Sequence, residues 1–118
     1  LIVDDSPTET FRFKEILNKN GYTVLEATNG ADGVTVAQAE QPDLVLMDVV
    51  MHGVNGFQAT RQIARGEKTK HIPIVIVSTK DQATDRVWGK RQGASDYLTK
   101  PVDENKLIEV IRQYINAG

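Results

Sequence analysis

The regular alternation of short apolar runs with longer amphipathic segments is the feature that most constrains this fold. Apolar, β-branched runs at residues 1–3, 22–27, 43–47, 74–77 and 96–99 predict strands. Segments with apolar residues at helical spacing follow each run, at residues 7–20, 31–40, 56–65, 82–92 and 104–117. A strand-helix alternation of this kind predicts right-handed crossovers and a parallel sheet covered by helices on both faces. The 118 residues are enough for one such domain and its core.

Local signals at the helix ends support these boundaries. Ser6 and Glu9 have the spacing of a capping box, with proline at the first helical position, and Gly21 is a natural stop for the first helix. The fourth helix is poorly patterned, and Gly89 weakens it by roughly 1 kcal/mol relative to alanine. We therefore expect the fourth helix to be a low-stability, bistable element. Its Trp88 is equally compatible with internal packing and with a partner surface.

Composition excludes several classes of protein. Without cysteine the chain has no disulfide, thiolate metal site or thiol nucleophile, and its net charge of -2 gives no strong attraction to nucleic acid or anionic membranes. The apolar runs are too short to span a bilayer, and no signal peptide is visible, so we expect a cytoplasmic protein. Because Leu1 already lies inside an expected strand, we also expect native residues to precede it.

Polar side chains that can act chemically follow four of the five predicted strands. In parallel sheets, ligands bind at the carboxyl ends of the strands. We therefore expect these side chains to converge on one crevice: Asp4 and Asp5 after the first strand, Asp48 after the third, Ser78 and Thr79 after the fourth, and Lys100 after the fifth.

These side chains have a consistent chemistry. A lone carboxylate at the end of an apolar strand, such as Asp48, must be solvated, paired or bound to a cation. Three neighbouring carboxylates repel each other unless a cation lies between them, and Mg2+ prefers oxygen ligands of this type. A carboxylate oxygen could then attack phosphorus, while the lysine and the hydroxyl bind the remaining phosphoryl oxygens. The sequence thus predicts a Mg2+-dependent phosphoryl acceptor.

The same residues resemble a known family over the whole chain. Val3-Asp4-Asp5-Ser6, Leu46-Met47-Asp48, Gly56, Ser78-Thr79 and Lys100-Pro101 match, in order and spacing, the receiver domain of two-component response regulators. The resemblance implies a CheY-like, flavodoxin-like α/β fold with sheet order 2-1-3-4-5 and a single receiver domain over residues 1–118. It also implies phosphorylation by a histidine kinase and a cis peptide before Pro101. No enzymatic activity is implied beyond the chain's own phosphotransfer and dephosphorylation.

Individual roles follow from the resemblance alone. Signalling is expected through protein contact by a monomer, on a surface formed by the fourth helix, the fifth strand and the fifth helix, without nucleic acid or membrane. The implied roles are Asp48 as phosphoacceptor, Asp5 as direct Mg2+ ligand, Asp4 as ligand largely through water, the Val50 carbonyl as further ligand, Ser78 as switch hydroxyl, Lys100 as phosphoryl-binding residue and Tyr97 as rotating aromatic.

A narrower resemblance and some departures refine this expectation. Residues 55–62 and 88–94 are similar to stand-alone regulators of chemotaxis-like pathways that control type IV pili. His52 stands where receivers usually have proline, which leaves the backbone freer. Val50 and Lys80 occupy positions that set the phosphoryl lifetime in this family. The basic residues 68–71 are expected to form a solvated loop.

Three alternatives stay open. A phosphate sink would pass no output and would only drain a sister regulator. A pseudo-receiver would bind partners without phosphorylation, although such domains typically lose an acid or the lysine that this chain keeps. A small aspartyl-phosphate phosphatase would place its nucleophile on the first strand in an Asp-x-Asp pattern, whereas this chain has adjacent Asp4 and Asp5 there.

Overall fold

Five parallel strands form one sheet in the order β2-β1-β3-β4-β5, as the sequence analysis predicted. The computed structural model describes residues 1–50 and 55–115. The strands are β1 (Ile2–Val3), β2 (Glu26–Ala27), β3 (Val45–Met47), β4 (Ile74–Ser78) and β5 (Asp96–Thr99). The predicted α/β class is therefore confirmed.

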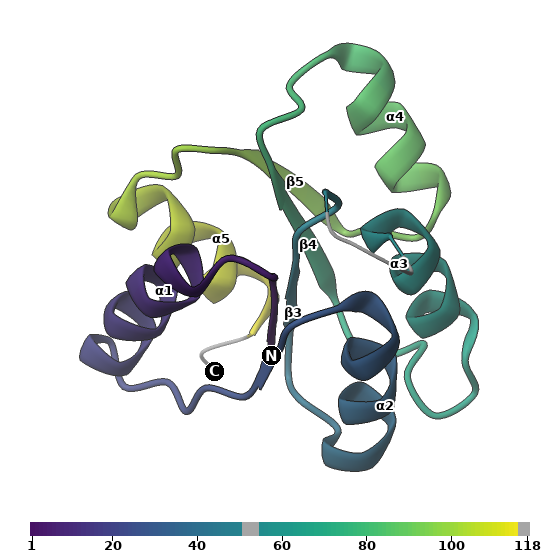
Figure 1. Ribbon diagram of the computed structural model, residues 1–118, viewed down its shortest axis with the longest axis horizontal. Coiled ribbons are helices and arrows are strands. Elements are labelled where there is room, and N and C mark those ends of the chain that lie inside the picture. The colour runs from purple at the N-terminus through teal and green to yellow at the C-terminus, as the bar shows by residue number, and fades with distance from the viewer. Residues whose placement is uncertain (51–54, 116–118) are drawn as a thin grey trace.

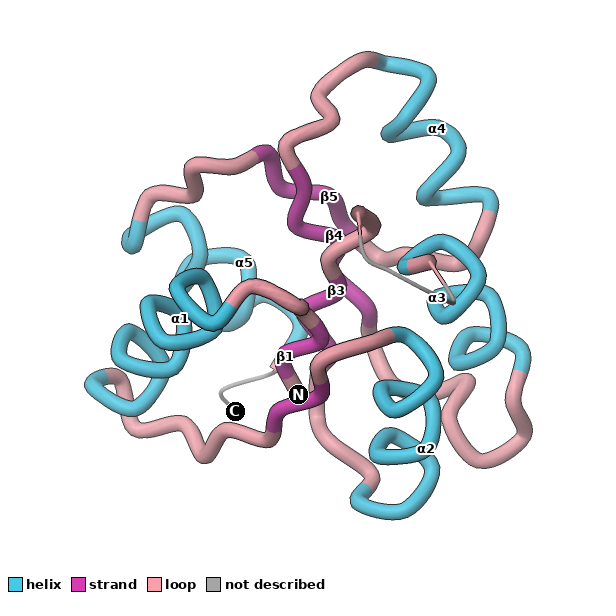
Figure 2. Tube along the Cα trace, in the orientation of Figure 1, coloured by secondary structure: helices cyan, strands magenta, loops and turns pink. Residues whose placement is uncertain are grey.

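Helices cover both faces of this sheet, with α1 and α5 on one side and α2, α3 and α4 on the other (Figure 1). Figure 2 shows how loops at the two ends of the sheet connect them to the strands. None of the helices in the described part of the chain is long and apolar enough to cross a membrane. The helices are α1 (Pro7–Lys19), α2 (Gly30–Glu40), α3 (Gly56–Arg65), α4 (Ala83–Arg91) and α5 (Glu104–Tyr114).

Burial of the two sheet faces explains this layering. On one face, Phe13 of α1 and Leu107 of α5 pack with side chains of β3 and β4. On the other face, Ala37 of α2 and Ile63 of α3 pack against Val45 and Met47 of β3. β3 and β4 are covered on both faces, which is why their sequences are continuously apolar.

Several predicted boundaries are wrong at the edges of the elements. The strand expected over residues 22–27 spans only Glu26–Ala27, because its one neighbour in the sheet, β1, is two residues long. β3 begins at Val45 rather than Asp43, since its first partner in β4 is Ile74. The last helix ends at Tyr114, with Ile115 as its C-cap. The predicted end at residue 117 lies outside the described residues.

The predicted capping box at the start of α1 forms only in part. Ser6 Oγ accepts a hydrogen bond from the Glu9 N–H at 3.3 Å, as expected. The Ser6 N–H, however, donates to Asp4 Oδ1 at 2.9 Å, in place of the expected Glu9 side chain. The start of α1 therefore orients Asp4, one of the carboxylates that the sequence predicts at the candidate site.

α4 lies close to the sheet because it presents a glycine to it. Gly89 is the buried residue of this helix. A Cβ atom there would lie 2.9 Å from Ile76 Cδ1 and 3.2 Å from Tyr97 Cδ2. A helix with so little buried apolar surface depends on other contacts for its position, and its low stability stays a prediction.

One of these contacts is made by Arg86, which ties α4 to the edge strand β5. Its Nη1 donates to the Tyr97 carbonyl at 3.2 Å, and its Nη2 donates to Thr99 Oγ1 at 2.7 Å. The guanidinium carbon lies 5.2 Å from the centre of the Tyr97 ring, within the range of a cation–π interaction. Asp96 Oδ1 accepts from the Tyr97 N–H at 2.8 Å. Side chains thus bind both backbone polar groups of Tyr97.

Candidate functional site

Three carboxylates meet at the carboxyl end of the sheet, as predicted. β1 and β3 are neighbours with Val3 opposite Met47, so the residues that follow these two strands emerge side by side. Asp4, Asp5 and Asp48 each offer an oxygen atom, and these atoms lie within 4.8 Å of one another. Asp4 and Asp48 are buried, whereas Asp5 is exposed. A divalent cation could therefore enter the site from solvent on the side of Asp5.

The environment of Asp48 disfavours its negative charge. Burial raises the pKa of the Asp48 carboxyl from its usual 3.8 to about 6, although the Val50 N–H and the Lys100 ammonium partly oppose the rise. The Val50 N–H donates to Asp48 Oδ1 at 3.2 Å. A cation beside this carboxylate would offset the cost of burial, so the electrostatics at this position fit a bound metal.

Lys100 reaches the same crevice from the end of β5. Its Nζ lies 3.1 Å from Asp4 Oδ2, and both side chains are largely buried. With Ser6 bound to Oδ1, each oxygen of Asp4 has a hydrogen-bond donor. The peptide bond between Lys100 and Pro101 is cis, as expected.

The donor set fits Mg2+. Mg2+ is bound in proteins through one or two carboxylates and keeps several waters, and here two buried carboxylates and an exposed one surround a common point. The Val50 carbonyl remains a predicted ligand. In the structure the Val50 N–H donates to Asp48, and the residue is 52% exposed.

Gly56 brings the start of α3 against the backbone that carries Asp48. A Cβ atom on Gly56 would lie 2.1 Å from the Asp48 carbonyl oxygen and 2.5 Å from Val49 Cα. Only glycine permits this approach without displacing main chain. Asn55 caps the helix here by accepting from the Gln58 N–H at 2.9 Å. The glycine that the sequence pattern singled out thus fixes the position of the acceptor.

Ser78 and Tyr97 are connected through the backbone of Lys80. Ser78 lies at the end of β4, fully buried, and its Oγ accepts from the Lys80 N–H at 3.1 Å. The hydroxyl of Tyr97 donates to the Lys80 carbonyl at 2.8 Å, and the ring is buried against Ile76 and Val49. One peptide segment therefore contacts both residues for which a switching role was predicted.

The remaining predicted residues are placed as follows. The side chain of Lys80 is exposed, as is Thr79. His52 lies outside the described residues. In the loop after α3, Thr69 is buried and donates to the Ile63 carbonyl at 2.6 Å, so the expectation of a fully solvated loop is wrong at this position. Sequence reasoning also missed Arg86, since one arginine in a weakly patterned helix gives no signal of its contacts.

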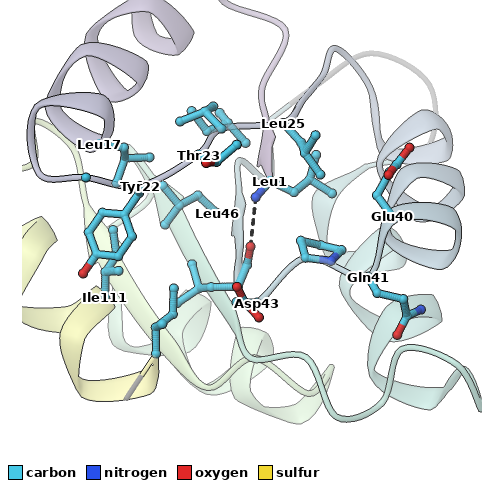
Figure 3. Close-up of a pocket in the computed structure, with 16 residues that line it drawn as sticks. Leu1, Leu17, Tyr22, Thr23, Leu25, Glu40, Gln41, Asp43, Leu46 and Ile111 are labelled. Carbon is cyan, nitrogen blue, oxygen red and sulfur yellow. Dashed lines mark hydrogen bonds between the residues drawn. The ribbon is translucent and has the colours of Figure 1, made fainter. Parts of the chain in front are cut away.

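A pocket at the opposite end of the sheet takes no part in this site. It lies between α1, α2 and α5 and is lined by residues that include Leu1, Tyr22, Asp43 and Ile111 (Figure 3). The dashed line in the figure is the hydrogen bond of 2.9 Å from Leu1 N to the Leu44 carbonyl. The lining lacks the convergent carboxylates and the lysine found beside Asp48.

Comparison with known families agrees with the geometry. Residues 1–112 match the response regulator receiver domain, and the chain belongs to this family.

Two relatives show how far the similarity extends. The chain is 62% identical over 111 residues to the protein PilH of Pseudomonas aeruginosa, which covers 94% of this chain and 92% of PilH. It is 36% identical over 112 residues to the response regulator PleD of Caulobacter vibrioides, but that match spans only 25% of PleD. The second relative is thus a longer protein that contains a similar domain.

Solved structures confirm the fold. The receiver domain of a Pseudomonas aeruginosa sensor histidine kinase superposes with a TM-score of 0.91 at 28% identity, covering 98% of this chain and 95% of that one. In that crystal structure a magnesium ion is coordinated in the active-site cleft. The chemotaxis protein CheY4 of Vibrio cholerae superposes with a TM-score of 0.90 at 26% identity, covering 96% and 94% of the two chains.

Proposed function

We propose that this receiver accepts a phosphoryl group on Asp48 from a phosphohistidine of a histidine kinase. The observation that carries the proposal is the meeting of Asp4, Asp5 and Asp48 within 4.8 Å, with Lys100 paired to Asp4. An Asp48 carboxylate oxygen forms the new bond to phosphorus while the N–P bond of the phosphohistidine breaks, and the histidine ring leaves with the bonding electron pair.

The surrounding residues have separate tasks in this transfer. Asp4, Asp5 and Asp48, with the Val50 carbonyl, would hold Mg2+, which when bound neutralises charge on the phosphoryl oxygens. Lys100 lies beside the carboxylates and can bind a further phosphoryl oxygen once it leaves Asp4. Gly56 lets the start of α3 lie against the backbone of Asp48 and Val49, which keeps Asp48 in place.

The phosphorylated state would be transmitted through Ser78 and Lys80. When the Ser78 hydroxyl turns to donate to a phosphoryl oxygen, its contact with the Lys80 N–H changes. Because Tyr97 is already buried and bonded to the Lys80 carbonyl, the change passes through this peptide to Tyr97 and α4. This route differs from the sequence expectation, in which Tyr97 acts as a rotating aromatic.

The biological setting follows the more similar relative. Since the chain is 62% identical to PilH, we place it in a chemotaxis-like pathway that controls type IV pili and twitching motility. It signals there as a cytoplasmic monomer by protein contact and turns over no outside substrate. A role as phosphate sink for a sister regulator uses the same chemistry at Asp48 and differs only in whether a partner reads the result.

The decisive experiment is phosphotransfer from a phosphorylated histidine kinase to the wild-type chain and to Asp48→Asn. We expect Mg2+-dependent transfer to the wild type and none to the variant, with both folded by circular dichroism. Asp81→Asn, at an exposed position, is the matched control and should be phosphorylated normally. Retained phosphorylation of Asp48→Asn would refute the assignment of the acceptor.

Two further measurements separate the alternatives. A pseudo-receiver would fail to bind beryllofluoride in the presence of Mg2+, and a phosphatase would turn over a small phosphate ester. Pull-down of partners with and without beryllofluoride distinguishes a protein that is read from one that only drains phosphate.

A further inference from the structure

The direction of Trp88 follows from the packing of α4. Gly89 faces the sheet, against Ile76 and Tyr97. Successive residues of a helix are about 100° apart, so Trp88 and Gln92, four residues apart, share one side of α4 next to the buried side. Gln92 Oε1 accepts a hydrogen bond from Arg61 Nε of α3 at 2.6 Å. Trp88 therefore lies on the side of α4 that faces α3, and Arg86 on the side that faces β5.

α3 presents arginine to the same surface. The ends of α3 and α4 touch, since a Cβ atom on Gly93 would lie 2.4 Å from Ala64 Cβ. Arg61 and Arg65, one helical turn apart, flank this contact on the solvent side, and both are exposed. Arg91, three residues after Trp88, neighbours it on the surface of α4 and is exposed. We call the exposed surface formed by Arg61, Arg65, Trp88 and Arg91 the α3–α4 face. Figure 1 shows these two helices next to one another, beside the sheet.

This face combines a large exposed aromatic side chain with concentrated positive charge. Trp88 is 45% exposed, and Val87 beside it is 52% exposed. Residues 56–72 and 87–93, which leave out Arg86 on the β5 side, together contain six of the 14 lysines and arginines of the chain but one of its 16 acids, Glu67. The net charge of -2 thus conceals a basic side, and the acidic excess lies on the rest of the chain.

We propose that the α3–α4 face is a docking surface for an acidic protein segment that places an apolar side chain against Trp88. Tryptophan and arginine are enriched among the interface residues that contribute most of the binding energy. The charge favours a partner rich in glutamate and aspartate, since opposite charges steer association. A nucleic acid is disfavoured because the chain as a whole is acidic and would repel a long polyanion.

The α3–α4 face is separate from the phosphoryl site. None of its four residues is among the carboxylates, the hydroxyl or the lysine around Asp48, so docking can be tested on the unphosphorylated protein. It is also separate from Arg86 and Tyr97, which lie on the β5 side of α4. The proposal can therefore fail while the phosphoacceptor assignment holds, and the reverse.

The test uses Trp88 as its own reporter, because it is the one tryptophan of the chain. The probe is a synthetic helical peptide with glutamate on one face and leucine at its centre, titrated into the full chain at low ionic strength while fluorescence is followed. A second peptide with glutamine in place of every glutamate is the matched control probe. Arg65→Gln/Arg91→Gln removes two charges from the face, and Lys106→Gln/Arg112→Gln removes two from exposed positions on α5.

We expect saturable binding of the glutamate peptide, at least tenfold weaker binding to Arg65→Gln/Arg91→Gln, and unchanged binding to Lys106→Gln/Arg112→Gln. The glutamine peptide should not bind. Absence of binding by the glutamate peptide, or equal loss in both double variants, would overturn the proposal. So would equally tight binding of a DNA duplex or of phosphatidylglycerol vesicles, because the face would then recognise negative charge alone.

Discussion

Gly56→Ala provides a demanding test of how the acceptor is held. The new Cβ atom would lie 2.1 Å from the Asp48 carbonyl oxygen, 2.5 Å from Val49 Cα and 2.8 Å from the Asp48 carbonyl carbon. All three neighbours are main-chain atoms, so no flexible side chain can move aside. Ordinary contact begins near 3.4 Å, and α3 and the backbone after β3 must therefore separate by more than 1 Å.

The expected cost is the balance of two terms. Overpacking of this kind costs about 3 kcal/mol or more, since main chain itself must shift. Replacing glycine by alanine in a helix returns about 1 kcal/mol at most. The free energy of unfolding should therefore fall by about 2 to 3 kcal/mol, which lowers Tm by roughly 10 °C for a domain of this size. Because Asp48 and Val49 move, affinity for Mg2+ should also fall, by about tenfold or more.

Urea denaturation measures the first effect, and Mg2+ titration in the folded protein measures the second. Gly21→Ala is the control, since Gly21 has a φ of 87° but nothing within 4 Å of a new Cβ atom. It should cost about 1 kcal/mol through backbone strain and leave Mg2+ affinity unchanged. If Gly56→Ala matched the wild type in both midpoint and Mg2+ affinity, the close contact with α3 could not be what positions Asp48.

Three further outcomes follow from the same contacts. Because burial raises the pKa of the Asp48 carboxyl to about 6, the folded state binds a proton more tightly than the unfolded chain, and stability without metal should fall as pH rises from about 4 to 6. Asp48→Asn should remove this pH dependence and stabilise the metal-free protein at pH 7 by about 1 to 2 kcal/mol, after allowance for solvent screening. Urea denaturation at a series of pH values measures the effect, and an unchanged pH profile in the variant would contradict the burial argument. Lys100→Met leaves Asp4 buried without its cation and should lower the free energy of unfolding by about 3 kcal/mol, part of which Mg2+ restores. Equal stability of variant and wild type in calorimetry without metal would count against the ion pair. Arg86→Ala should cost about 1 to 2 kcal/mol and selectively increase hydrogen exchange in α4, and a uniform increase across the chain would show that Arg86 does not anchor that helix.

The sequence predicts the architecture well where burial and turn chemistry agree. α3 and β5 have the predicted boundaries. Asn55 caps the start of α3, and β5 is bounded by a turn before it and by Pro101 after it. β2 was predicted too long because its apolar residues, such as Tyr22 and Val24, pack against the core without strand pairing. Apolar pattern reports burial, whereas strand length depends on the neighbouring strand.

The candidate site was predictable to a similar degree. The positions of Asp4, Asp48 and Lys100 follow from the rule that polar residues after parallel strands converge, and the structure brings them together. Contacts that depend on the exact rotation of a helix were not predictable. The opposite directions of Arg86 and Trp88 on α4 emerge only once Gly89 is seen to face the sheet.

The contacts of Arg86 and Asp96 with Tyr97 also bear on self-association. β5 is an edge strand, and an open strand edge is a template on which a strand of another molecule can add. Here two charged side chains bind the N–H and the carbonyl of Tyr97 at that edge. A movement that takes α4 away from β5 would withdraw Arg86 and open the edge. Any state that displaces α4 must therefore be short-lived or covered by a partner, because otherwise the same movement would favour aggregation.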